Sequence, residues 1–459
     1  MDKKTSLIIS IFILTAIVAS VAMGISLLFP FIISNIFCIA FLSLSGLDIK
    51  KLLFIGYKGM MECKVLYIFI LLIGANISVW MASGVVPGMM YYGFEYLKET
   101  NFLFMAFVLT AFMSVFMGTA VGTISTLGIA LLGVGQGFGI PEEVLLGVIV
   151  SGAFIADKVS PISGLFNLTL KATETSFKRA LISMSKTLVP VVIITATIYY
   201  LLGLIYASGE DYQLVAAYQQ ALLEGFKISP LLLLLPVIVV LLPLKGVSII
   251  PTILAGLIGG GIITMVYQGD TTFLQLISYT FFGYSAQTNV PELNSILISG
   301  GIAGMVEVVA IVASVITLSN ILDRSGVLKP VIYDPIKKVK EKGELILKTG
   351  LIGGMLTVVT CDQTMGIVLL GKVYKPKFVE LGVDKSILAR TISDSSTVIA
   401  PLMPWNVNAI IIGTLTGVSA TMYAPYAVLC YLFPLTVLYI FVSSKLGKVK
   451  LKKLEKILN

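Results

Sequence analysis

Four acidic residues lie within long apolar stretches of this 459-residue sequence, namely Asp157, Glu307, Asp362 and Asp394. A carboxylate at membrane depth is costly, so it either pairs with a neighbouring group or binds and exchanges an ion. A hydrogen bond to another helix would explain Glu307 equally well. Because the chain contains no histidine, any proton that it carries must bind Asp, Glu or Lys. The acidic residues therefore predict ion or proton chemistry.

Two of these carboxylates also have a structural explanation in their sequence neighbours. Asp157 precedes Lys158, with which it could simply pair. Asp394 follows Arg390 by one helical turn, a spacing that favours an ion pair on one helix face. Asp362 has no basic residue within eight positions, so we expect it to bind a cation. Asp157 and Asp362 are the two residues that we expect to contact Na+ directly.

Hydroxyl and amide residues accompany these carboxylates. Their oxygens can complete the shell of a cation where a membrane helix is interrupted. The alternative is that Gly and Thr only permit close helix packing, and Trp405 either lines a cavity or anchors such packing. The remaining candidates for ion or substrate binding are Thr119, Thr123, Ser125, Thr126, Ser160, Ser163, Asn167, Thr360, Gln363, Thr364, Thr397, Trp405 and Asn406.

The stretches that carry these residues have the composition of membrane spans. With 57% hydrophobic and 12% charged residues, the chain is excluded from the water-soluble globular class, and its apolar runs are long enough to cross a bilayer as helices. The net charge of +8 comes from Lys and Arg between the spans, as the positive-inside rule predicts. We therefore expect no nucleic-acid partner, and no zinc site from the four scattered cysteines.

The sequence predicts an all-α polytopic protein of the cell membrane, with both termini in the cytoplasm and a retained first span. Segments 102–133 and 345–371 are too short to cross twice but have similar loops at both ends, so they are predicted to be re-entrant hairpins. Residues 157–164 and 400–406 interrupt two of the spans. The ten predicted spans are 6–23, 25–47, 65–86, 144–170, 188–206, 229–244, 246–267, 293–322, 386–413 and 423–442.

An internal repeat is visible around the first hairpin. Sliding the sequence by 238 positions aligns residues 118–133 with 356–371, with Thr119/Thr357 and Thr126/Thr364 among the identical pairs. We expect two units, 1–228 and 229–444, and a basic tail, 445–459, on the inner leaflet. Five crossings in each unit would give the units opposite orientations. Inverted repeats with broken helices are typical of secondary transporters that bind solute at the bilayer midplane.

At these residues the chain resembles the NhaC-type Na+/H+ antiporters of the ion-transporter superfamily. The resemblance covers segments 74–93, 118–135, 151–167, 362–371 and 390–406. It implies coupling to a sodium or proton gradient and, in some relatives, exchange or uptake of organic acids or amino acids. Gly164, Leu165 and Phe166 stand where the family pattern has Asp-Thr-Thr. Their presence removes oxygen ligands from the first helix break and could make room for an organic substrate.

These observations predict a cation-coupled secondary transporter with alternating access. Its partners would be the lipid bilayer and a small ion or organic solute, Na+ and/or H+ would be the coupling ion, and no other cofactor is expected. A homodimer is a further expectation. The nearest alternative is a Na+-coupled or antiporting carrier of an amino acid or small carboxylate. A channel and an intramembrane enzyme with an Asp362–Asp394 dyad are more distant alternatives.

Overall fold

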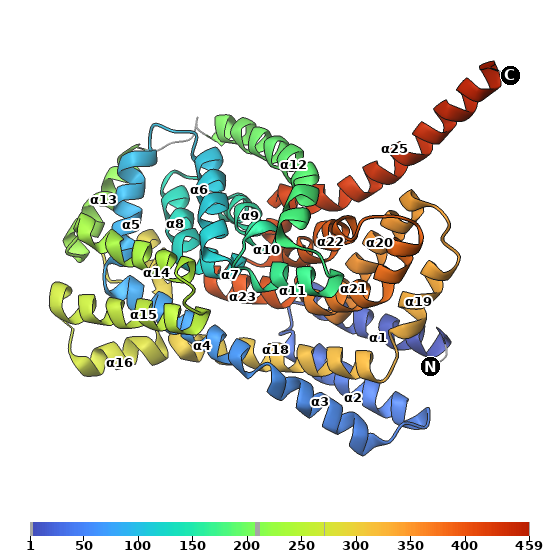
Figure 1. Ribbon diagram of the computed structural model, residues 1–459. Coiled ribbons are helices and arrows are strands. Elements are labelled where there is room, and N and C mark those ends of the chain that lie inside the picture. The colour runs from blue at the N-terminus through green and yellow to red at the C-terminus, as the bar shows by residue number, and fades with distance from the viewer. Residues whose placement is uncertain (1–2, 207–211, 270, 459) are drawn as a thin grey trace.

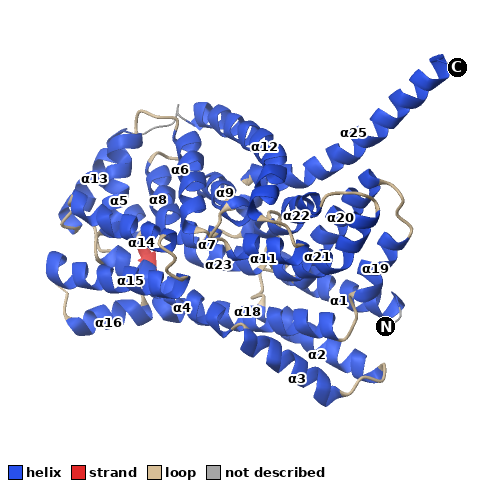
Figure 2. Ribbon diagram, viewed as in Figure 1, coloured by secondary structure: helices blue, strands red, loops and turns tan. Residues whose placement is uncertain are grey.

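The computed structural model describes residues 3–206, 212–269 and 271–458, and these are almost entirely helical (Figure 2). Ten of the described helices are long and apolar enough to cross a membrane, which confirms the prediction of an all-α polytopic fold. Apart from helices and the loops between them, the described residues form two antiparallel two-residue strands, β1 (Tyr284–Ser285) and β2 (Ile298–Ser299).

The chain begins with five helices that precede the first hairpin. Two of them lie mostly outside the predicted spans: α3 follows the second predicted span, and α5 begins at the end of the third. Val86, Met90 and Phe94 form a buried stripe on α5 at helical spacing, which explains why this segment is helical. The five are α1 (Lys3–Ala22), α2 (Leu28–Leu44), α3 (Ile49–Glu62), α4 (Lys64–Ala82) and α5 (Val85–Leu97).

The first hairpin and the first broken helix follow. Gly118, with a φ of 69°, turns the hairpin in the left-handed region that favours glycine. The broken helix is interrupted between Val159 and Gly164, as predicted. The elements are α6 (Phe102–Met117), α7 (Ala120–Thr123), the π-helix η1 (Ile124–Gly128), α8 (Ile129–Gly137), α9 (Glu142–Ala153), α10 (Ala156–Val159), α11 (Gly164–Thr173) and α12 (Phe177–Tyr206).

A connecting region leads to the second half. The last span before the second hairpin begins at Gly301 rather than at residue 293, because α17, β2 and a left-handed Gly301 (φ 59°) occupy the start of the predicted span. The elements are α13 (Tyr212–Gly225), η3 (Pro230–Leu233), α14 (Leu234–Leu244), α15 (Ile249–Ile262), the π-helix η4 (Ile263–Gln268), α16 (Phe273–Phe282), α17 (Pro291–Ile296), α18 (Gly301–Arg324) and α19 (Lys329–Lys337).

The second hairpin turns at Cys361 and Asp362, and the second broken helix opens near Pro404. The final helix runs without interruption from the last span into the basic tail and extends away from the body of the protein (Figure 1). The elements are α20 (Lys342–Thr360), α21 (Gln363–Glu380), α22 (Lys385–Ile392), the π-helix η5 (Ser393–Thr397), η6 (Ala400–Leu402), α23 (Val407–Thr416), α24 (Ala420–Tyr423), η7 (Ala424–Tyr426) and α25 (Val428–Leu458).

The two hairpins and broken helices recur at a spacing of 243 residues, not 238. The helix after the first tip spans Ala120–Gly137, and its counterpart spans Gln363–Glu380, both bounds being 243 positions later. The same shift relates α11 to α23. The alignment at 238 is therefore corrected, because it pairs residues at different distances from the two tips, such as Thr126 with Thr364. Thr119 therefore corresponds to Asp362, and the inverted orientation of the units stays a prediction.

The helices form two layers. In Figure 1, α2, α3, α4, α15, α16 and α18 lie on one side, and the hairpins and broken helices lie on the other. In the most apolar window of Glu142–Thr173, 89% of the residues are buried, against 22% for α12. The first broken helix therefore occupies the protein core, and α12 presents its apolar side chains outward, as a lipid-facing helix does.

Candidate functional site

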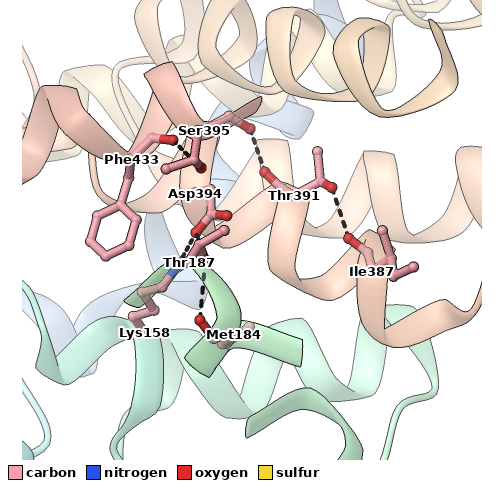
Figure 3. A network of polar contacts seen from close by, with 9 residues as sticks. Lys158, Met184, Thr187, Ile387, Thr391, Asp394, Ser395 and Phe433 are labelled. Carbon is pink, nitrogen blue, oxygen red and sulfur yellow. Dashed lines mark hydrogen bonds and ion pairs between the residues drawn. The ribbon is translucent and has the colours of Figure 1, made fainter. Parts of the chain in front are cut away.

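An ion pair between the ammonium of Lys158 and the carboxylate of Asp394 joins the two broken helices (Figure 3). The two side chains are 0% and 1% exposed. Thr187 Oγ1 of α12 donates to Asp394 Oδ1 at 3.4 Å, and Lys158 Nζ lies 4.0 Å from the ring centroid of Phe433 on α25. The pair is thus enclosed by helices from both halves of the chain.

The backbone around Asp394 is a π-helix, a rare form that is frequent at functional sites. Four of its side-chain oxygens are buried and have no hydrogen-bond partner among the described residues: Ser393 Oγ, Asp394 Oδ2, Ser396 Oγ and Thr397 Oγ1. Carboxylate and hydroxyl oxygens are the ligands that hard cations prefer. The sequence predicted Asp394 and Thr397 but missed Ser393 and Ser396, although the continuous run of hydroxyl residues was a signal.

In the structure, the charged residues do not pair with their neighbours in the sequence. Lys158 binds Asp394 rather than Asp157, and Asp157 Oδ1 accepts instead from Ser163 Oγ at 3.1 Å. The Nε of Arg390 is buried and has no hydrogen-bond partner among the residues that the structure describes. Neither local pair forms among the described residues: Asp394 binds Lys158 of a distant helix, and Asp157 binds Ser163 six residues later.

The polar residues of the first break stabilise its geometry. Ser163 Oγ accepts from Phe166 N and so caps α11. Ser160 Oγ donates to Val115 O of the first hairpin at 2.6 Å, and Asn167 Nδ2 donates to the carbonyl oxygens of the break. These bonds satisfy backbone groups that an interrupted membrane helix would leave unpaired.

The hydroxyl groups of the first hairpin donate to their own helix. Thr123 Oγ1 donates to Thr119 O, and both Ser125 Oγ and Thr126 Oγ1 donate to Gly122 O, each at 2.9 Å. This arrangement accords with the packing explanation for these residues. The structure does not bring them to the Lys158–Asp394 pair by any hydrogen bond among the described residues.

Asp362 caps the helix that follows the second tip. Its Oδ2 accepts from Thr364 N at 3.0 Å, and its backbone carbonyl accepts from Thr360 Oγ1 at 3.0 Å. The second break packs directly on this tip, because Trp405 Nε1 donates to Val358 O at 2.9 Å. Of the two roles considered for Trp405, the structure supports that of a packing anchor.

Amide side chains continue this contact between tip and break. Asn406 Oδ1 accepts from Asn408 N at 3.0 Å, and Gln363 Oε1 accepts from Asn408 Nδ2 at 3.0 Å. Gln363 Nε2 and Asn406 Nδ2 are buried and have no hydrogen-bond partner within residues 3–206, 212–269 and 271–458. The second tip therefore carries donors without acceptors, whereas the π-helix carries oxygens without partners.

Glu307 lies apart from these groups. Its carboxylate is exposed and accepts from Ser26 Oγ at 2.5 Å. It lines a cavity of about 190 Å³ with residues that include Gly304 and Thr414. Its partner Ser26 lies in the loop between α1 and α2, so the hydrogen bond reaches a loop and not a neighbouring helix.

Comparisons with known proteins agree on one family. The sequence profile of the Na+/H+ antiporter family matches residues 164–445. The chain is 30% identical over 383 residues to the Na+/H+ antiporter NhaC of Alkalihalophilus pseudofirmus, covering 83% of each protein. It is 30% identical to the malate-2H+/Na+-lactate antiporter of Bacillus subtilis, covering 77% of this chain and 76% of that one.

A third relative, the arginine/ornithine antiporter ArcD of Halobacterium salinarum, is 31% identical, and the match covers 81% of this chain and 77% of ArcD. Similarity over such large shares of both chains, together with the ten apolar helices, assigns the protein to a family. The chain belongs to the Na+/H+ antiporter family and is a cation-coupled antiporter of the cell membrane.

Proposed function

We propose that the Lys158–Asp394 pair is the exchange site, at which a sodium ion and a proton alternate. The observation that carries this proposal is the buried carboxylate of Asp394, whose Oδ1 binds Lys158 and whose Oδ2 has no partner in the described part of the chain. Ser393 and Thr397 would contribute hydroxyl oxygens to a cation at Oδ2. A bound cation would then compete with the ammonium of Lys158 for the same carboxylate.

Charge balance at this pair explains how the two ions exchange. A charge that loses its partner inside a protein is strongly destabilised. When Na+ replaces the ammonium at Asp394, Lys158 restores neutrality by releasing its proton to water. When Lys158 is protonated again, its ammonium displaces Na+ from the carboxylate. One Na+ therefore exchanges for one proton at this pair, while Asp394 stays ionised throughout.

Net transport requires that the pair face each side of the membrane in turn. The pair joins α10 of one half to η5 of the other, so movement of either half changes its access to water. Two units of opposite orientation would provide two such states. Within this proposal both termini face the cytoplasm. Asp157 and Asp362 are secondary candidates for Na+ or proton binding. Assembly as a homodimer remains a prediction.

Proton movement in everted membrane vesicles tests the proposal. Vesicles containing the protein are acidified inside by respiration, and a fluorescent base reports the pH gradient. Addition of Na+ should partly dissipate this gradient, and Asp394→Asn should abolish the response. A full response from Asp394→Asn vesicles would overturn the assignment of the site.

Antiport of an organic solute is the second candidate function. The relatives include antiporters named for malate and lactate and for arginine and ornithine. In this chain Gly164 stands where the family pattern has Asp, and a Cβ added there would meet no atom within 4 Å. The space beside the first break therefore favours a solute larger than a metal ion.

A further inference from the structure

A cavity of about 780 Å³ lies where the two halves of the chain meet, away from the hairpin tips and the helix breaks. Ser176 and Arg179 line it at the start of α12, and Asp384 and Lys385 line it at the start of α22. Ser176, Arg179 and Asp384 are exposed, so water reaches the cavity. The loops that carry these residues are rich in Lys and Arg and are therefore predicted to face the cytoplasm.

Two helices lead from this cavity to the exchange site, and they pack against each other. On α12, Arg179, Ser183 and Thr187 follow one another at steps of four residues, which makes them neighbours on the helix surface. Thr187 donates to Asp394. On the other helix, the chain runs from Lys385 at the cavity to Asp394 in η5. At 1.5 Å per residue, roughly 12–14 Å of helix separates the cavity from the ion pair.

Two buried polar side chains lie about halfway along these helices. Arg390 on α22 is 8% exposed and Ser183 on α12 is 5% exposed. Arg390 Nε and Ser183 Oγ both lack a hydrogen-bond partner in the part of the chain that the structure describes. Their neighbours Ala180, Met184 and Ala389 belong to one buried cluster, which brings the two segments together. Buried polar groups without a protein partner normally bond to water, so these two side chains indicate a route for water.

The positive charge of Arg390 is not paired along this route. Arg390 takes part in none of the ion pairs printed between described residues, and the nearby Asp394 binds Lys158 instead. Arg390 also lies close enough to Lys158 for the two charges to repel each other. A buried unit charge acts strongly over several ångströms, and a positive residue in a pore excludes cations. A metal cation that moved from the cavity toward Asp394 would therefore meet this charge first.

We propose that Arg390 is a charge barrier between the cytoplasmic cavity and the exchange site, which admits water between α12 and α22 but excludes Na+ in this conformation. This inference rests on the proposed exchange site at Asp394. Na+ then reaches Asp394 from the cytoplasm only when movement of one half separates α12 from α22. A route that stayed open to Na+ would let the ion leak without a proton in exchange, so the barrier keeps the two movements coupled.

Charged thiol reagents test the barrier in everted vesicles that contain the full chain with Cys63→Ser. A cationic trimethylammonium methanethiosulfonate and its anionic sulfonate analogue have similar sizes, and their reaction rates with Ser183→Cys are compared. Ser176→Cys at the mouth of the cavity is the reference and should react with both reagents. We expect Ser183→Cys to prefer the anionic reagent at least about tenfold more strongly than Ser176→Cys does, because only Ser183 lies beside the unpaired charge of Arg390.

A matched pair of variants assigns the preference to the charge. Arg390→Lys should retain the preference of Ser183→Cys for the anionic reagent, and Arg390→Gln should remove it. Thr195→Cys should not react from this face, because Thr195 is buried and lies beyond Thr187 along α12. No reaction at Ser183→Cys, no preference there, or an equal preference with Arg390→Gln would overturn the inference.

The preference at Ser183→Cys is measured with Arg390 in place, so it tests the barrier even if Arg390→Gln does not fold. Labelling also does not require transport. Loss of the sodium-driven proton response with this labelling pattern intact would reject the exchange site at Asp394 and leave the charge of the route established. A normal proton response without the preference would reject the barrier alone.

Discussion

Lys158 and Asp394 form a buried ion pair although 236 residues separate them in the sequence. One residue belongs to the broken helix of the first half and the other to that of the second half. Burial of two charges gains little stability over an apolar pair of similar size, but loss of one partner is costly. The pair is therefore better explained by ion exchange than by a contribution to folding.

Single and double substitutions separate these two roles. Asp394→Asn or Lys158→Gln should each abolish coupled Na+/H+ exchange and destabilise the protein by about 3–5 kcal/mol, because each leaves a buried polar or charged group unpaired. The double variant Lys158→Met/Asp394→Leu should regain thermal stability in detergent without regaining exchange. Exchange by the double variant would show that the pair is only structural.

The hydroxyl groups of the π-helix should determine the affinity for sodium. Ser393→Ala and Thr397→Val each remove an unpartnered oxygen beside Asp394 and should raise the Na+ concentration for half-maximal exchange about tenfold, the equivalent of ~1.4 kcal/mol. Ser395→Ala is the control, because Ser395 Oγ already donates to Thr391 O at 2.7 Å. A larger effect from Ser395→Ala than from the other two would exclude these residues as sodium ligands.

Close packing holds the π-helix against the second hairpin. A Cβ built at Gly353 would lie 2.4 Å from Ser396 Oγ, which no real contact allows. Gly353→Ala should therefore destabilise the protein by about 1–3 kcal/mol, measured by thermal unfolding in detergent. Adding Ser396→Ala should restore most of the loss, since it removes the clashing atom. A double variant no more stable than Gly353→Ala would contradict this contact.

Glu174 joins the two halves outside the membrane spans. Its carboxylate accepts from Lys375 Nζ at 2.6 Å and from Lys385 Nζ at 3.0 Å, and these bonds hold its pKa below the ordinary value. A lowered pKa means that the stabilisation is present above the unfolded pKa of about 4.3 and is lost as the pH falls through the folded value. Glu174→Gln should therefore lower the melting temperature at neutral pH, and this difference should vanish in acid.

A second substitution at the same position separates the contribution of the ion pairs to stability from that of the backbone conformation. Glu174 has a φ of 53°, and Gly417 holds the equivalent position in the second half with a φ of 75°. Glu174→Gly loses the same ion pairs as Glu174→Gln but favours the left-handed conformation. Its melting temperature at neutral pH should be higher than that of Glu174→Gln. A lower melting temperature would show that the backbone at this position is unstrained.

Local composition predicted where the two helical hairpins turn and where the two helices break, whereas the re-entrant placement of the hairpins stays a prediction. Gly118 marks the first tip, and Pro161 and Pro404 mark the two breaks, because these residues interrupt helices for backbone reasons visible in the sequence. The helix α5 was missed because its Pro and Gly residues suggest a loop, whereas the buried stripe that defines it, through Met90 and Phe94, is recognised only once its partner helix is known.

The contacts of the site could not be predicted in the same way. Lys158 has an acidic neighbour in sequence, and Asp394 has a basic one, yet their actual partner is each other. Pairing of this kind depends on how distant helices pack. The cap at Asp362 and its absence at Thr119 likewise became comparable only when the helix bounds fixed the spacing of the repeat.

The orientation of the two halves provides the last prediction. Glu142 and Lys385 are the first residues of the equivalent helices α9 and α22. If the halves are inverted, Glu142→Cys should react with a membrane-impermeant maleimide added outside intact cells, and Lys385→Cys should react only after the membrane is opened. Cys38, Cys361 and Cys430 are buried, and Cys63 is partly buried, so replacing Cys63 with Ser gives a suitable background. Labelling of both positions from the same side would reject the inverted arrangement. Alternating access would then need a different structural basis. Two inverted units can interchange the inward-facing and outward-facing states by exchanging their conformations, whereas two parallel units cannot.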